Sequence, residues 1–212
     1  MIPETQETDA EGAEVTGTEV AGTQLAGAEM SGTEVAGTEP NGNEEQKNGE
    51  HMEYQFKKAT QNDAREILAL YQSVKGTPYC AWSDTYPGPQ EIEYDLSREA
   101  LFSLWDGDTL VAVITVDKDE QVEQLTCWSK ELEPSVELSR LGVHPGYQNQ
   151  GLACRMIREV MDIMRSEGKK SIHYLVAKQN LKAIRSYAKL HPNIVGESDL
   201  FMTDWWCCEI PI

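Results

Sequence analysis

Between residues 53 and 212, the arrangement of apolar and polar positions predicts a series of strands separated by helices. Strand-like patterns occur at residues 54–58, 101–105, 110–116, 135–143, 171–176 and 202–210. Apolar residues spaced three and four apart predict helices that start at Asn62 or Asp63, at Gly151 and at Asn180. The turn at residues 106–108 predicts a hairpin. This order predicts a mixed α/β or α+β domain with one central sheet covered by helices.

Residues 1–52 follow a different pattern, in which the chain repeats every five residues. Glycine recurs at this interval from Gly12 to Gly42, with an apolar residue at a fixed position in several of the units. A five-residue step turns a helix by about 140° and sends strand residues to alternating faces, so neither element gains a buried face. The unit resembles the pentapeptide-repeat β-solenoids, but the few units here would form little more than one coil. We expect residues 1–52 to be a disordered tail and residues 53–212 to form the folded domain.

The charge of the chain is unevenly distributed. The 212 residues include 36 acidic and 18 basic ones, for a net charge of -18. Residues 1–52 account for -11 of this total, whereas residues 140–190 contain ten basic and three acidic residues. The overall acidity argues against nonspecific nucleic-acid binding, because neutralising phosphates requires surplus Lys and Arg. The positive segment, in contrast, can attract a polyphosphate ligand.

Other features narrow the class of protein. No run approaches the roughly 18 apolar residues of a membrane span, and the first residues lack the pattern of a secretion signal. The five cysteines are odd in number and show no CxxC spacing, and the four histidines are scattered. These observations favour reduced thiols over disulfides or a zinc site. We expect a cytoplasmic protein that contains no structural metal and does not enter the membrane.

The most informative segment is the junction at residues 141–153, where a predicted strand enters a polar turn and a helix begins with small residues. Unpaired amides and the positive end of a helix dipole meet at such a junction, which suits a pyrophosphate group. Gly151 and Ala153 would let phosphate oxygens approach the backbone closely. Any strand-to-helix turn can use glycine, so the spacing by itself leaves an ordinary turn open.

Two motifs resemble those of the GCN5-related N-acetyltransferases. Residues 148–153 match the Q/R-x-x-G-x-G/A signature of this family and follow a strand that ends in Val143, His144, Pro145. Residues 180–190 resemble the family's N-x-x-A-x-x-x-Y-x-K-L helix. Two motifs in the expected order are more specific than either alone. The resemblance covers about residues 53–212 and implies the family's central mixed β-sheet flanked by helices, with N-acetyltransferase activity that uses acetyl-CoA.

The resemblance also implies roles for individual residues. The backbone of Leu141 and Val143 would pair with the pantetheine arm, and Asn180 would contact the cofactor near its thioester end. Tyr187 would be the general acid that protonates the departing CoA thiolate. His191 follows the second motif where the family usually has glycine, which affects the local turn more than the chemistry. The amides that would hold the CoA pyrophosphate are those of Gln148, Asn149, Gln150, Gly151, Leu152 and Ala153.

A general base is expected because the attacking amine must be neutral. Glu137 is the first candidate, since it lies on the strand that leads to the cofactor loop, and Ser139 would face the same way. An ordinary exposed strand residue is the alternative for Glu137. Cys154 starts a helix, where a small packing residue is a simpler interpretation than a reactive thiol. Four aromatic residues could line an acceptor pocket or belong to the core: Tyr79, Trp82, Trp105 and Trp128.

The acceptor is expected to be a small molecule with a cationic amine, such as a polyamine, an aminosugar or a lysine-like group. Residues 53–139, which should frame the acceptor, contain seventeen acidic and seven basic residues. The resemblance implies an enzyme that transfers an acetyl group to a primary amine by direct attack in a ternary complex, and we expect it to be a monomer or a homodimer. A catalytically silent acyl-CoA-binding regulatory module and an interaction protein that acts through its tail are the alternatives.

Overall fold

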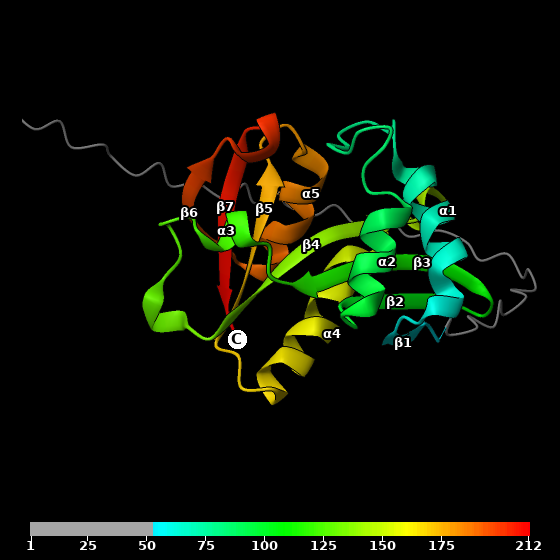
Figure 1. Cartoon of the computed structure of the whole chain (residues 1–212), viewed down its shortest axis with the longest axis horizontal. Helices are drawn as coiled ribbons and strands as arrows, with labels where there is room; N and C mark the ends of the chain where they lie inside the picture. Colours follow the sequence, from blue (N-terminus) through cyan, green and yellow to red (C-terminus); the bar gives the residue numbers. More distant parts are fainter. Residues whose placement is uncertain (1–52) are drawn as a thin grey trace, which may run out of the picture. The chain divides into compact units, whose positions relative to one another are not determined.

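The computed structural model describes residues 53–212, and the prediction of a disordered tail at residues 1–52 lies outside this range. The described residues form one seven-stranded sheet in the order β1-β2-β3-β4-β5-β7-β6 (Figure 1). The strands are β1 (Gln55–Lys58), β2 (Leu101–Asp106), β3 (Thr109–Asp117), β4 (Ser135–Val143), β5 (Ser171–Ala177), β6 (Asn193–Ser198) and β7 (Trp205–Pro211). The α-helices are α1 (Ala64–Val74), α2 (Pro89–Ser97), α3 (Glu120–Glu123), α4 (Leu152–Ser166) and α5 (Leu181–Tyr187). The 3-10 helices are η1 (Gln61–Asp63), η2 (Lys130–Leu132), η3 (Pro145–Tyr147), η4 (Ala188–Leu190) and η5 (Leu200–Met202).

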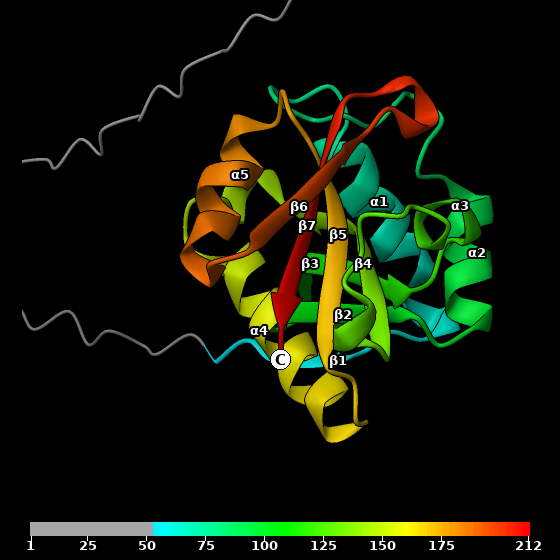
Figure 2. The ribbon, with the colours of Figure 1, turned by 90° about the vertical axis from the view of Figure 1, so that its left-hand side faces the viewer.

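Helices cover both faces of the sheet. Figure 2 shows α1 and α2 on one side of the strands and α4 on the other. Each face has its own apolar core: Ile67 and Tyr71 of α1 pack in the first, and Met156 and Val160 of α4 pack in the second. These side chains are fully buried because their three- and four-residue spacing turns one stripe of each helix toward the sheet. The predicted mixed sheet flanked by helices is confirmed.

The first four strands form an antiparallel meander, in which each strand pairs with the next one along the chain. β2 and β3 are joined by the turn at residues 106–108, where Gly107 has a φ of +55° that glycine adopts without strain. The predicted hairpin is therefore confirmed. This meander forms one half of the sheet, and β4 is its last strand.

β4 and β5 run parallel but pair over a short distance only. Residues 135–137 of β4 are in register with residues 171–173 of β5, and no pairing follows. Figure 1 shows the two strands diverging beyond this point. Backbone groups along the second half of β4 consequently lack a strand partner on the β5 side. A gap thus opens in the middle of the sheet.

A bulge lies in β4 just beyond the point of separation. Ser139 is in register with Thr115, but Gly142 is in register with Val113, so β4 contains one residue more than β3 in this interval. Arg140 lies within the bulge and has a φ of +48°, which is uncommon for a residue other than glycine. The bulge bends β4 away from β5 and determines where the Arg140 side chain points.

Three of the α-helices and strands were not predicted from the pattern of the sequence. One is α2, for which no helix was expected; Gly88 caps it, Pro89 begins it, and the Glu91 carboxylate accepts a hydrogen bond from the Gly88 amide at 2.7 Å. The others are the short helix α3 and β6, an edge strand with little burial and hence little alternation. The last strand begins at Trp205 rather than at residue 202, since η5 precedes it.

Candidate active site

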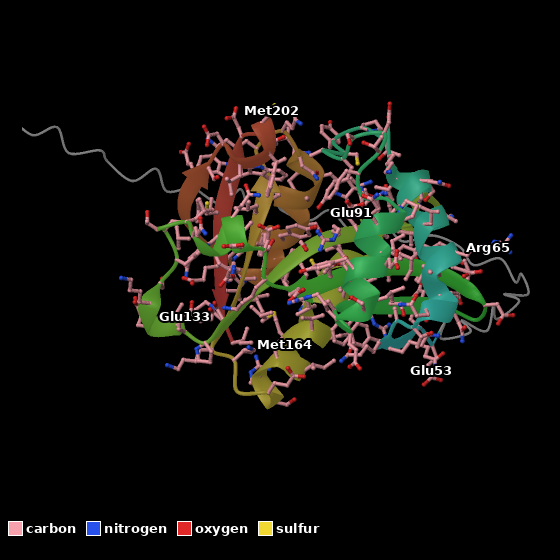
Figure 3. All side chains as sticks on the ribbon, in the orientation of Figure 1. Glu53, Arg65, Glu91, Glu133, Met164 and Met202 are labelled. Carbon is pink, nitrogen blue, oxygen red and sulfur yellow. The ribbon has the colours of Figure 1, made fainter. Side chains whose placement is uncertain are left out.

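The separation of β4 from β5 is accompanied by a cavity of about 1600 Å³. Both strands line it, together with the loop after β4, α5, the segment that includes α2, and the connection between β6 and β7. In Figure 3, Met202 projects from that connection at the top of the molecule and Glu91 lies near the start of α2. Both residues line the cavity, whereas Glu133 and Met164, labelled in the lower part of the same view, do not. The cavity therefore lies between the two halves of the sheet, where β4 and β5 separate.

The loop between β4 and α4 presents a set of backbone amides. Asn149 and Gly151 have φ values of +65° and +80°, and α4 begins at Leu152 without a side-chain cap. Within residues 53–212, the amides from Asn149 to Ala153 donate no hydrogen bond to another backbone group. A Cβ atom on Gly151 would meet nothing within 4 Å, so there is open space at this point. These amides and the helix dipole suit an anion, and the loop fits the pyrophosphate of acetyl-CoA.

Five of the six residues predicted to hold the pyrophosphate line the cavity: Gln148, Asn149, Gly151, Leu152 and Ala153. Gln150 is the exception, and its side chain accepts a hydrogen bond from the Tyr54 hydroxyl at 3.1 Å. The side chain of Gln148 connects two parts of the site. Its Nε2 donates to the Val143 carbonyl at 3.0 Å, and its Oε1 accepts from the Lys182 ammonium at 2.5 Å. Gln148 thus ties the end of β4 to α5.

Leu141 and Val143, the residues predicted to pair with the pantetheine arm, both line the cavity. They belong to the part of β4 that has no partner on the β5 side. Gly142, between them, pairs with β3 on the other edge. The Val143 carbonyl already accepts one hydrogen bond, from Gln148, so an added ligand would use its second lone pair. The geometry suits an extended ligand that lies along β4 as a further strand would.

Asn180 and Tyr187 lie at the two ends of α5, and both line the cavity. The Asn180 Oδ1 accepts a hydrogen bond from the Ala183 amide at 3.0 Å and caps the helix. The ring of Tyr187 packs edge-on against Tyr174 with the centroids 5.6 Å apart. Burial raises the pKa of the Tyr187 hydroxyl, so this group stays protonated near neutral pH. It can therefore donate a proton.

Glu137 lies in β4 at the last position that pairs with β5, and it also lines the cavity. Its Oε2 accepts a hydrogen bond from the Asp119 amide at 2.8 Å. Burial raises the pKa of Glu137 to about 7, although the hydrogen bond from Asp119 opposes this change. The alternative of an exposed strand residue is wrong, because only 6% of Glu137 is accessible. A carboxyl group that titrates near pH 7 can accept a proton from an amine.

The bulge directs Arg140 toward α2. The Arg140 Nε and Nη2 donate to the two oxygens of the Asp95 carboxylate at 2.9 and 2.8 Å, and Nη1 donates to the Tyr86 hydroxyl at 3.0 Å. The Thr115 hydroxyl also donates to Asp95, at 2.9 Å. Burial raises the pKa of Asp95, while Arg140 opposes the change. Ser139 also lines the cavity, and its register with β3 places it on the same face as Glu137, as predicted.

The predicted aromatic residues divide into two groups. Tyr79 and Trp82 line the cavity, whereas Trp105 and Trp128 do not. Trp105 is a core residue that donates a hydrogen bond to Ser103, and Trp128 packs on the His173 ring with the centroids 4.6 Å apart. Cys154 is buried, and its thiol donates to the Ser186 carbonyl at 3.1 Å. The simpler interpretation of Cys154 as a packing residue agrees with this burial.

Several residues of the acceptor side were missed from the sequence. They are large, accessible or half-buried side chains that line the cavity from α2, the loop before it, the β6–β7 connection and the start of β7: Tyr86, Tyr94, Phe201, Met202 and Trp205. The cap at Gly88 could have revealed α2 and hence Tyr94. The position of Phe201 and Met202 depends on positive φ values of 57° and 56°, which their residue types do not suggest.

Among residues 53–212, no three His, Cys, Asp or Glu side chains lie where they could hold a metal ion together. No helix in that range is long and apolar enough to cross a membrane.

The structure is similar to several solved acetyltransferases. An acetyltransferase of the GNAT family from Streptococcus agalactiae aligns with a TM-score of 0.64 at 14% identity and covers 75% of this chain and 95% of its own. The PaiA N-acetyltransferase from Thermoplasma acidophilum, in complex with coenzyme A, aligns with a TM-score of 0.60 at 16% identity; the alignment covers 76% of this chain and 100% of that one. The yncA protein from Salmonella typhimurium, with its cofactor acetyl-CoA, aligns with a TM-score of 0.58 at 16% identity and covers 74% of this chain and 93% of its own. No curated protein matches the chain by sequence.

The divided sheet with a strand–loop–helix anion site is thus a fold shared with acetyltransferases. Residues 67–191 match the model of the acetyltransferase (GNAT) family. This range covers more than half of the chain, and the chain belongs to that family.

Proposed function

We propose that this protein is an N-acetyltransferase that transfers the acetyl group of acetyl-CoA to a primary amine by direct attack in a ternary complex. The observation that carries the proposal is that one cavity contains the free edge of β4, the amides of the anion loop, Tyr187 and Glu137. The solved structures with coenzyme A or acetyl-CoA support the choice of donor. Acetyl-CoA is a substrate here, and it supplies the activated acetyl group.

The residues of the chain divide the reaction into a binding part and a proton-transfer part. The amides of residues 149–153 hold the pyrophosphate, and Leu141 and Val143 hold the pantetheine arm along β4. The amine nitrogen forms a bond to the thioester carbon while the carbon–sulfur bond breaks. Glu137 takes the proton from the amine, directly or through one water, and Tyr187 gives its proton to the departing sulfur. Atoms and charge balance, because one proton is removed from nitrogen and one is supplied to sulfur.

The charge of the cavity supports a cationic acceptor. Carboxylates line its acceptor side, and two of them are paired: Asp95 with Arg140 and Asp117 with Arg98. Glu120 and Glu137 form no ion pair among the described residues. The surplus negative charge favours an acceptor that arrives as an ammonium ion, such as a polyamine, an aminosugar or a lysine-like group. The accessible aromatic side chains nearby can contact the apolar part of such a molecule.

The cytoplasm is the location that we propose for the reaction. Acetyl-CoA is a metabolite of the cell interior, and all five cysteines in the described residues are free. Thiols without disulfide partners suit a reducing compartment.

The test is a screen of amines with acetyl-CoA, in which released thiol is measured. Polyamines, aminosugars and lysine derivatives are compared with neutral amines of similar size, and cationic amines should be turned over faster at low salt. Equal turnover of neutral and cationic amines would contradict the acceptor class. Tight binding of acetyl-CoA without turnover of any amine would instead support a silent regulatory module.

Tyr187→Phe separates catalysis from cofactor binding. This variant keeps the ring that packs on Tyr174 and loses the hydroxyl alone. Turnover should fall by about two to three orders of magnitude, while the Kd for CoA stays the same. Tyr71→Phe is the matched control, since it also removes one tyrosine hydroxyl, but Tyr71 does not line the cavity and its hydroxyl forms no hydrogen bond in the described range. Wild-type turnover of Tyr187→Phe would remove this tyrosine from the mechanism.

A further inference from the structure

One side of α5 and η4 carries three basic residues along the cavity: Lys182, Arg185 and Lys189, which we call the α5 basic stripe. Their spacing of three and four residues places them on one side of the helical segment. All three are exposed, and none of them forms an ion pair within residues 53–212. Uncompensated positive charge on a cavity wall indicates a ligand with negative charge.

Three other basic residues of the same half of the domain are neutralised. Arg155 lies 3.5 Å from Glu159, Arg165 lies 2.6 Å from Asp162, and Lys178 pairs with Glu197. None of Arg155, Arg165 and Lys178 lines the cavity. Arg158, Lys169 and Lys170 form no ion pair in the described range, but they do not line the cavity either. The stripe therefore differs from its basic neighbours because its unpaired charges lie on the cavity wall.

The position of the stripe relates it to the anion loop. The Lys182 ammonium donates to Gln148 Oε1, and Gln148 is the first residue of the loop motif. Arg185 and Lys189 continue from Lys182 along successive turns, so a ligand bound to the loop can extend over them. The loop amides already suffice for one pyrophosphate. The stripe is thus available for a second phosphate group of the same ligand.

We propose that the α5 basic stripe binds the 3′-phosphate of coenzyme A and selects the complete cofactor over donors without this group. The inference rests on the proposed function, because it assumes that acetyl-CoA occupies the cavity. Coenzyme A carries a pyrophosphate and, separately, a phosphomonoester on its ribose, whose charge near pH 7 is between about -1.5 and -2. Arg and Lys are the side chains that bind such a group most strongly. Dephospho-CoA and acyl groups on carrier-protein phosphopantetheine lack it, so both would be poorer donors.

The experiment compares CoA with dephospho-CoA by calorimetry on the full chain, first at low ionic strength and then at about 0.15 M salt, because exposed charges are screened by salt. The variants are Arg185→Gln and Lys189→Gln, singly and together. Lys182→Gln is made separately, since it also removes the bond to Gln148. Arg158→Gln and Lys170→Gln are matched controls, as both residues are exposed, form no ion pair in the described range and do not line the cavity.

The wild-type protein should bind CoA about tenfold more tightly than dephospho-CoA at low salt, which corresponds to about 1.4 kcal/mol. The Arg185→Gln/Lys189→Gln variant should lose most of this preference through weaker CoA binding, with the affinity for dephospho-CoA nearly unchanged. The controls should keep the preference, and added salt should reduce it in the wild type.

Each contrary result has a distinct meaning. If the wild type binds both ligands equally, or the double variant keeps the preference, the 3′-phosphate subsite is overturned while the proposed function stands. In that case the α5 basic stripe would bind another polyanion, such as an acidic polypeptide. If neither CoA nor dephospho-CoA binds to the wild type, the proposed function itself fails, and this inference fails with it.

Discussion

Asp95 and Arg140 form a bidentate ion pair that joins α2 to the bulge of β4. Asp95 is 1% exposed and the Arg140 side chain 16%, so the pair is largely removed from water. Arg140 contributes its backbone to the strand that faces the proposed cofactor and its side chain to the wall that faces the acceptor. The pair therefore connects the proposed cofactor site with the proposed acceptor site.

Removing one member of this pair should strongly destabilise the fold. Asp95→Asn leaves the Arg140 charge buried without its partner, and the free energy of unfolding should fall by about 3 to 5 kcal/mol. The double variant Asp95→Leu/Arg140→Met removes both charges, and its free energy of unfolding should fall much less. Urea unfolding of the wild type and the two variants measures these free energies. As a control, Arg98→Met breaks the more exposed pair with Asp117 and should have a far smaller effect; equal losses would contradict the role of burial.

Glu137 should determine how the reaction rate depends on pH. Because the pKa of Glu137 is raised to about 7, kcat/KM should increase as pH rises through 7 and then level off. Glu137→Gln should reduce kcat by about 10²- to 10⁴-fold and remove this dependence, while the amide keeps the bond from Asp119. Glu99→Gln, which changes a carboxylate with a 77% exposed side chain, is the matched control. A similar pH profile in Glu137→Gln would assign the base to another group.

Glu137 should make the fold less stable as pH rises, whereas an ion-paired carboxylate makes a fold more stable as pH rises. The folded protein holds the Glu137 proton more tightly than the unfolded chain does, since the pKa rises from 4.5 to about 7. The favourable contribution of Glu137 to the free energy of unfolding is complete below pH 4.5 and is lost as pH rises through 7. The free energy of unfolding should change by about 3 kcal/mol over this range. Unfolding measured between these limits should therefore show a smaller loss for Glu137→Gln than for the wild type. Parallel curves for the two proteins would contradict the raised pKa.

Gly151 and Gly107 offer a matched pair of substitutions. Both have positive φ, and a Cβ atom on either would meet nothing within 4 Å. Gly151→Ala and Gly107→Ala should each destabilise the fold by about 1 kcal/mol, because alanine is strained at positive φ. Only Gly151→Ala should also weaken CoA binding, since the new methyl group occupies the space above the anion loop. Calorimetry distinguishes the two, and equal CoA affinity would place the phosphate elsewhere.

The geometry of the proposed cofactor half of the site could be predicted from the sequence because it depends on the local backbone. Gly151 and the polar residues before it specify a strand–loop–helix turn whose amides are free, whatever the rest of the fold does. The same holds for Asn180, whose cap starts α5 three residues before Ala183. Motif and structure therefore agree in this half of the domain.

The acceptor half depends on tertiary structure and was predicted poorly. α2 was not predicted, since Gly88 and Pro89 suggest a turn as readily as a helix start. Arg140 gives no sign in the sequence of its positive φ, so the bulge and the pair with Asp95 appear only in three dimensions. Trp105 and Trp128 show the converse, because residue type did not distinguish a core aromatic side chain from one on the cavity wall.

The early parting of β4 from β5 has a consequence for the cofactor-free protein. From residue 138 onward, β4 offers an unpaired edge in the interior of a sheet, which another chain could extend by adding a strand. A bound pantetheine arm would cover this edge as it bonds to it. Solubility during storage or expression should therefore improve when CoA is present, for a reason separate from any gain in folding free energy.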